Sequence, residues 1–202
     1  SSTMNILLPF LVLLIIARVA AYHPFTLAVF TALAGRALVA VALAAGLWLP
    51  HMPTEWGGMG LGHVELAMVQ AEAARSYYGP WVFNCQAPDE GNMHTLLHWG
   101  TDEQKDTYLK ALCDGMTWSC FAMTEPDVAS SDATNIECSM AREGDEYVIN
   151  GRKWWSSGAG DPRCRLYIVM GKTDRGAPKH RQQSMLLVPA GSPGVKVLRP
   201  LS

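Results

Sequence analysis

The distribution of charge along this chain constrains its fold more than any single motif does. Of the 34 basic and acidic residues (16 and 18) in the 202-residue sequence, only Arg18 and Arg36 fall in the first 54 positions. Residues 4–17 and 27–49 form two apolar runs, and each run with its flanks is about the 20 residues that a helix needs to cross a bilayer core. The pattern predicts a membrane-type helical hairpin over residues 1–48, followed by a soluble body.

Two other readings of this apolar head compete with a membrane hairpin. A cleaved signal peptide would have one apolar core behind a basic start, whereas here no basic residue precedes Arg18 and there are two cores. A pair of helices buried in a soluble protein would explain the alanines between Ala28 and Ala45 and the depth of Arg36, which is unfavourable in lipid. Hydropathy favours the membrane reading.

Composition excludes several classes for the rest of the chain. A net charge of −2 argues against binding to nucleic acid through phosphate contacts. The five cysteines form no C-x-x-C pair, which argues against a disulfide scaffold or a zinc ribbon and indicates a reducing compartment: the cytoplasm if the chain is bacterial, a mitochondrion or peroxisome if it is eukaryotic. His94 and His98 are four residues apart but have no third ligand nearby in the sequence, so we predict no metal site.

The body changes from helical to extended patterning along its length. We expect helices near 63–75 and 92–99, and a third that begins with a capping box at Thr101 and Gln104 and runs to Cys113. The segments expected as strands are Thr117–Met123, Asn135–Ala141, Glu146–Ile149, Lys153–Ser156, Arg165–Gly171, Ser184–Pro189 and Val195–Arg199. The sequence therefore predicts an α+β chain with a partial helical domain at 49–115 and an antiparallel β-barrel or sandwich at 116–202.

A turn at the end of the first expected strand carries several polar groups. After Met123, a proline-containing turn presents the hydroxyls of Thr124, Ser130 and Ser131 together with several backbone N–H groups in a row. Such a turn can hold a planar, hydrogen-bonding ligand with an anionic group. Serine and aspartate also favour turns without any ligand, so composition alone leaves both readings open.

A second unusual stretch is Lys153-Trp154-Trp155-Ser156-Ser157-Gly158. In a strand, successive side chains face opposite ways, so we expect one tryptophan to enter the core and the other to offer a flat surface to a ring system. Ser156 and Ser157 would supply hydrogen-bond donors beside that surface.

Together these stretches resemble the acyl-CoA dehydrogenase family, whose middle β domain has a T-E-P turn after a strand and, further on, an N-G-x-K-x-W segment. Here these are Thr124-Glu125-Pro126 and Asn150-Gly151-Arg152-Lys153-Trp154-Trp155. The resemblance covers residues 46–202, includes Glu55-Trp56-Gly57-Gly58 and Gly100-Thr101-Asp102-Glu103-Gln104-Lys105, and is strongest to family members ten and eleven. The apolar head instead resembles the membrane segment of a larger bacterial acyl-CoA dehydrogenase.

The resemblance implies FAD-dependent α,β-desaturation of a medium- or long-chain acyl-CoA in fatty acid β-oxidation, with an electron-transfer flavoprotein-type acceptor. Ser131 would also lie near the acyl-CoA. The turn is one residue longer than the usual family turn, so Ser130 and Ser131 both remain candidates for the family serine, and the following Asp132 favours Ser131. The implied flavin contacts are Phe121, Ala122, Met123, Thr124, Ser130, Ser131, Trp155, Ser156 and Ser157.

Desaturation needs a carboxylate base, and Glu125 is the obvious candidate within these motifs. The resemblance argues against it, because it implies a base on a C-terminal helical domain that lies beyond Ser202. That domain would also make the subunit contacts of a full-length homo-oligomer. We therefore predict no catalytic residue here. The alternative function is a non-catalytic, membrane-tethered module that binds acyl-CoA or a partner, or a chimeric gene product.

Overall fold

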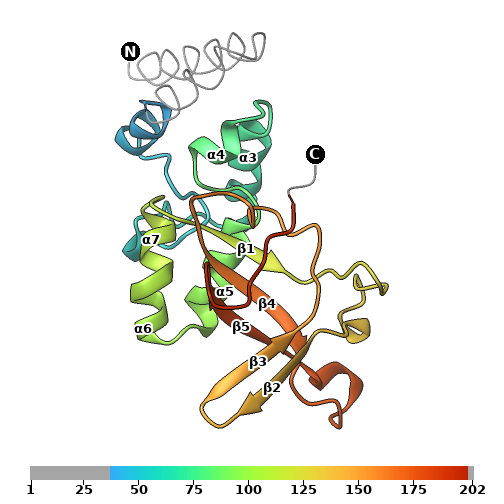
Figure 1. The fold of residues 1–202 in the computed structure, drawn as a ribbon. Coiled ribbons are helices and arrows are strands. Elements are labelled where there is room, and N and C mark those ends of the chain that lie inside the picture. The colour runs from blue at the N-terminus through green and yellow to red at the C-terminus, as the bar shows by residue number, and fades with distance from the viewer. Residues whose placement is uncertain (1–36, 200–202) are drawn as a thin grey trace, which may run out of the picture. The chain divides into compact units, whose positions relative to one another are not determined.

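A computed structural model describes residues 37–199 of the chain (Figure 1). These residues form two compact units, one ending at Gln86 and the other beginning at Ala87. The first unit is helical, and the second combines helices with one mixed β-sheet. The expected α+β class is confirmed.

The first unit is built from short helices around a small core. Residues 37–44 are helical, and the chain then turns at Gly46, whose φ of 69° suits glycine. Three further helical segments follow: η1 (Thr54–Trp56), α3 (His63–Ala73) and α4 (Gly79–Val82). The core consists of Ala42, Ala73, Val82, Phe83 and Cys85, with Leu38 and Leu47 packed against it.

The predicted membrane hairpin lies mostly outside the described residues, since residues 1–36 are not among them. The end of the second apolar run is described, and there it packs in protein: Leu49 is buried and its N–H donates to the carbonyl of Phe83 at 3.0 Å. Between residues 37 and 199, no helix has both the length and the hydropathy to cross a membrane. Hydropathy could not anticipate this packing, because a protein core and a lipid core are equally apolar.

Helices open the second unit. α5 (Asp89–Trp99) is followed by α6 (Asp102–Gln104), a π-helical turn η2 (Lys105–Leu109) and α7 (Lys110–Cys113). The capping box is confirmed, because the N–H of Gln104 donates to the Thr101 hydroxyl at 3.2 Å and the N–H of Thr101 donates to the Gln104 side chain at 3.0 Å. Gly115 ends this helical region with a φ of 65°.

The sheet of the second unit has five strands: β1 (Trp118–Ala122), β2 (Ser139–Glu143), β3 (Glu146–Asn150), β4 (Cys164–Lys172) and β5 (Gln183–Pro189). β4 is central, because it pairs parallel with β1, antiparallel with β5 and, at its last residue, parallel with β2. Only β2–β3 and β4–β5 are antiparallel pairs.

The expected antiparallel barrel or sandwich is therefore wrong: the described residues form an open mixed sheet. Periodicity identifies a strand but not its direction, and the long connection between β1 and β4 allows the parallel pairing. Two expected strands, Lys153–Ser156 and Val195–Arg199, are not strands. A third, Asn135–Ala141, begins only at Ser139, after the 3₁₀ turn η3 (Ala133–Asn135).

A buried polar network fixes β1 against α5. The carboxylate of Asp89, in the first turn of α5, accepts hydrogen bonds from the N–H and hydroxyl of Ser119 on β1. The amide of Asn92 donates to the same hydroxyl at 2.9 Å. All three side chains are buried, so each bond forms where water does not compete. This network fixes the strand whose far end carries the candidate site.

Candidate functional site

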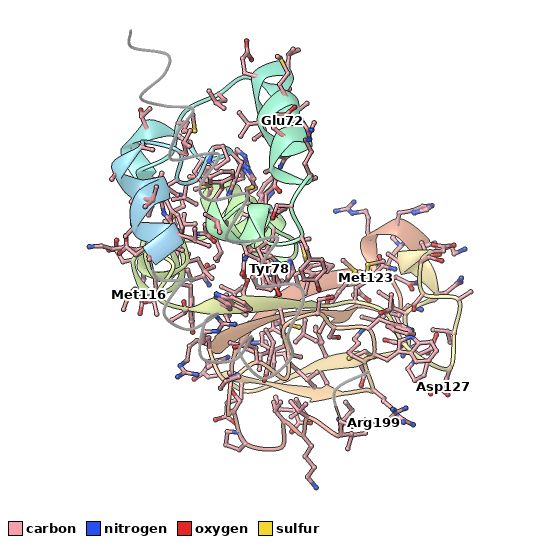
Figure 2. The ribbon with its side chains drawn as sticks, turned by 90° about the horizontal axis from the view of Figure 1, so that it is seen from above. Glu72, Tyr78, Met116, Met123, Asp127 and Arg199 are labelled. Carbon is pink, nitrogen blue, oxygen red and sulfur yellow. The ribbon has the colours of Figure 1, made fainter. Side chains whose placement is uncertain are left out.

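The candidate site lies where the chain leaves β1. Figure 2 shows Met116 before the start of β1, and Met123 and Asp127 beyond its opposite end. The turn that follows Met123 is held by its own polar groups: the N–H of Glu125 donates to the Ser130 hydroxyl at 2.7 Å, and the Asn135 amide donates to the carbonyl of Ala129 at 3.1 Å. Side-chain bonds of this kind make such turns specific.

The two adjacent serines of this turn have different environments. Ser130 is 4% exposed, and its hydroxyl is used inside the turn. Ser131 is exposed. The next residue, Asp132, accepts a hydrogen bond from the N–H of Thr134 at 2.9 Å and so begins η3. The turn therefore directs one serine inward and leaves the other facing solvent.

The stretch of residues 153–158, called the tryptophan segment below, runs directly beside this turn. The N–H of Trp154 donates to the carbonyl of Thr124 at 3.0 Å, and the Thr124 hydroxyl donates to the carbonyl of Trp154 at 2.6 Å. Further along, a side chain on Gly158 would meet the carbonyl oxygen of Ser119 at 2.9 Å, so the segment returns close to β1. Two motifs about 30 residues apart in the sequence thus form one surface.

A buried ion pair lies beneath that surface. The Lys153 ammonium donates to the Glu125 carboxylate at 2.8 Å and to the carbonyl of Met123 at 2.7 Å. The same carboxylate accepts from the N–H groups of Glu137, at 2.8 Å, and Cys138, at 2.9 Å. The side chains of Lys153 and Glu125 are 12% and 6% exposed.

This environment sets the protonation state of Glu125. Burial alone would raise the pKa of its carboxyl group, but the hydrogen bonds from Lys153 and from the N–H groups of Glu137 and Cys138 outweigh burial and lower the pKa below its ordinary value. The carboxylate is ionised, and its oxygens are occupied by donors. It is thus unsuited to remove a proton from a substrate.

The tryptophans do not behave as a strand would require. Trp154 and Trp155 are 43% and 65% exposed, and their ring centroids lie 5.7 Å apart with the planes tilted by 54°. The expectation that one of them enters the core is wrong, because the segment is not extended. Trp155 has a φ of 54°, which is rare for a bulky side chain and costs about 1–3 kcal/mol. Such strain persists only where the neighbouring structure fixes it.

The structure brings most of the predicted contact residues to this end of the sheet. Phe121 and Ala122 lie in β1, and Met123 follows it directly. Ser156 is close enough to Cys120 to affect the thiol, whose pKa is nevertheless raised to about 12, chiefly by burial. The sequence did not indicate the roles of Lys153 and Glu125. The only feature of the sequence that could have indicated this ion pair is that each of the two motifs, otherwise polar or aromatic, carries one of two opposite charges.

Comparison with known proteins identifies the family. The acyl-CoA dehydrogenase N-terminal domain matches residues 23–116, and the acyl-CoA dehydrogenase middle domain matches residues 120–202. The chain belongs to the acyl-CoA dehydrogenase family. Human acyl-CoA dehydrogenase family member 11 is 54% identical over 158 residues, and mouse family member 10 is 55% identical over 166 residues. The resemblance to members ten and eleven is thereby confirmed.

Solved structures of acyl-CoA dehydrogenases and related proteins share the fold. A putative acyl-CoA dehydrogenase from Mycobacterium abscessus is 50% identical, with a TM-score of 0.80 over 83% of this chain and 41% of that one. The FAD complex of PigA is 26% identical, with a TM-score of 0.63 over 79% of this chain and 41% of PigA. The two curated relatives are matched over 78% and 80% of this chain, but this chain spans only 20% and 16% of their own lengths.

Proposed function

We propose that this chain forms part of an FAD-dependent acyl-CoA dehydrogenase that desaturates the α,β bond of medium- or long-chain acyl-CoA thioesters. The observation that carries the proposal is the direct hydrogen bonding between the Thr124 turn and the Trp154 segment, which makes the two family motifs one surface at the end of β1. The FAD complex of PigA, a structural relative, supports the choice of cofactor.

The residues of this surface suit an isoalloxazine ring, which is flat and has a polar edge. The exposed indole of Trp155 offers a flat apolar face. The Thr124 hydroxyl donates to Trp154 and keeps its lone pairs, so it can still accept a hydrogen bond from the polar edge. We assign the neighbouring contacts to Phe121, Ala122, Met123, Ser156 and Ser157. Bound FAD would supply the hydride-accepting centre of the desaturation.

Ser131 is the better of the two serines for contact with FAD and acyl-CoA. Its neighbour Ser130 is buried, and the hydroxyl of Ser130 already accepts the N–H of Glu125. Ser131 is exposed and can donate to a thioester or flavin oxygen. We propose that the general base comes from another part of the protein, because Glu125, the carboxylate buried at this surface among the described residues, is occupied. Transfer of electrons to a flavoprotein acceptor is a further proposal, as is membrane attachment through the part of residues 4–48 that precedes residue 37.

The test is FAD binding and dye-coupled dehydrogenation by the product of the complete gene, with octanoyl-CoA and palmitoyl-CoA as substrates. We expect a yellow protein, and we expect Trp155→Ala to weaken FAD binding and change the flavin absorption spectrum. Trp99→Ala is the matched control, because Trp99 is 84% exposed at the end of α5, outside the candidate site. A colourless wild-type protein, or equal effects of the two variants, would refute the proposal.

A further inference from the structure

We infer that Glu125 and Lys153 are a positioning pair that sets the geometry of the flavin-facing surface without touching the flavin. This inference rests on the proposed function. The pair lies beneath the surface rather than on it, and it connects three segments: the turn after β1, the start of β2 and the tryptophan segment. Its role would be to hold Thr124 and Trp155 at fixed places relative to each other.

Lys153 is the connection from the tryptophan segment to the turn. Its ammonium group spans two positions of the turn, the Met123 carbonyl at 2.7 Å and the Glu125 carboxylate at 2.8 Å. Thr124 lies between those two positions, so its own place is fixed from both sides. Hydrogen bonds to charged groups are roughly twice as strong as neutral ones, and these two form where water has little access.

Glu125 is the connection from the turn to the sheet. Its carboxylate receives the N–H groups of Glu137 and Cys138 just before β2, and its own N–H holds Ser130. The Cys138 carbonyl in turn accepts the N–H of Lys172 at 2.8 Å, at the end of β4. The ion pair is therefore anchored to two strands of the sheet. We expect this anchoring to make the exposed surface above the pair more rigid.

The strained backbone of Trp155 points to what the pair achieves. A left-handed φ of 54° at a bulky residue persists only where surrounding contacts over-determine it. The contacts before Trp155 are the two bonds of Lys153 and the two bonds between Trp154 and Thr124. Without the Lys153 bonds, we expect the tryptophan segment to relax and the indole of Trp155 to move relative to Thr124.

The chemistry of the pair distinguishes it from a simple attraction of opposite charges. Glu125 must accept two backbone N–H groups as well as the ammonium group, so a lysine at position 125 would leave those donors unpaired. Exchanging the two residues, as Glu125→Lys with Lys153→Glu, should consequently not restore the wild-type geometry. Lys153→Arg keeps the charge and can donate to both acceptors, so it should retain more of the wild-type geometry than Lys153→Met does.

The experiment compares Lys153→Met with Lys153→Arg in the product of the complete gene. The matched control is Lys110→Met, which makes the same change at an exposed lysine on α7. We expect Lys153→Met to weaken FAD binding and to lower kcat by on the order of 10- to 100-fold, the effect of misplacing a reacting group by about 1 Å. KM for acyl-CoA should change little. The circular dichroism of bound flavin should change with Lys153→Met and be retained with Lys153→Arg.

The outcomes separate this inference from the function on which it rests. If wild type binds no FAD, the proposed function fails. If wild type binds FAD and Lys153→Met has unchanged affinity, kcat and flavin circular dichroism, the positioning role is refuted. Hydrogen exchange of the Trp154 N–H gives a readout without flavin: its protection should fall in Lys153→Met while that of the β3 amides is kept. If Lys153→Met does not fold, Lys153→Gln replaces it, and the flavin measurements and the hydrogen exchange are interpreted in the same way.

Discussion

Gly151 is a sharp test of the geometry beneath the candidate site, because the Asn-Gly step brings the tryptophan segment against Cys138. A methyl group on Gly151 would lie 2.6 Å from the Cys138 sulfur, 2.7 Å from its Cβ and 3.0 Å from its Cα. Cys138 cannot move away cheaply, since it is buried, its N–H is bonded to Glu125 and its carbonyl is bonded to the N–H of Lys172.

These contacts set the size of the expected effect. Overpacking a buried site costs about 1–3 kcal/mol. Alanine also reduces the conformational entropy of the unfolded chain, which stabilises the folded state by about 0.4–1 kcal/mol. This gain applies here because the φ of Gly151 lies outside the left-handed range, so alanine can adopt it. The midpoints of these two ranges differ by about 1.3 kcal/mol, and we expect Gly151→Ala to lower the free energy of unfolding by about that amount. If Cys138 instead moves and loses its bond to Glu125, the cost rises by about 1.5–3 kcal/mol.

The assay is urea denaturation of the 202-residue chain, in which a lower midpoint with an unchanged slope reports lost stability. Gly91→Ala is the matched control: Gly91 lies in α5 with no atom within 4 Å of an added Cβ, so alanine should stabilise the helix by up to about 1 kcal/mol. Cys138→Ala should reduce the cost of Gly151→Ala by removing the nearest atom. If Gly151→Ala is as stable as wild type while Gly91→Ala behaves as expected, the close approach is not real.

Three further predictions concern groups with different physical roles. The lowered pKa of Glu125 contributes stability that is present above its unfolded pKa of about 4.3 and is lost as the pH falls through the folded pKa. Glu125→Gln should therefore be less stable than wild type by about 3–5 kcal/mol at pH 6. In thermal melts, this difference in stability should narrow toward pH 3. A constant gap would contradict the ion-pair assignment. Thr101→Ala removes a capping-box acceptor and should cost about 1 kcal/mol in urea denaturation, whereas Thr107→Ala, within η2, should cost less. Burial raises the pKa of Cys120 to about 12 and of Cys164 to about 11. An aromatic disulfide reagent at pH 8 should therefore leave both thiols unmodified until the chain unfolds. Rapid modification of the folded chain would show that the sheet is not packed as described.

Elements that depend on nearby residues were predictable from the sequence. The capping box at Thr101 and Gln104 is specified within four residues, and it forms as expected. β3 is expected at Glu146–Ile149 and observed at Glu146–Asn150, because the Gly144 turn before it fixes the hairpin with β2. Hairpin partners are neighbours in the chain, so their pairing follows from local signals.

Elements that depend on distant partners were not predictable in the same way. β1 was expected at nearly its observed bounds, but its parallel pairing with β4 joins residues such as Phe121 and Ile168, which nothing local relates. The expectation that the tryptophan segment forms a strand is wrong for a related reason. Alternation of side chains assumes an extended backbone, but Trp155 has a left-handed φ, and its neighbour Trp154 is hydrogen-bonded to a turn about 30 residues earlier.

The candidate site shows the limit of reading function from residue types. Ser130 and Ser131 are adjacent and chemically identical, and the sequence left both as candidates for the same role. The fold uses the Ser130 hydroxyl to accept the N–H of Glu125, and the carboxylate of that same glutamate receives Lys153 from the opposite motif. A hydroxyl or carboxylate becomes available to a ligand only when the backbone does not already use it. At this surface the Ser130 hydroxyl, Glu125 and Lys153 are occupied by hydrogen bonds, whereas Ser131 and Trp155 are exposed, so we propose these two as groups available to a ligand.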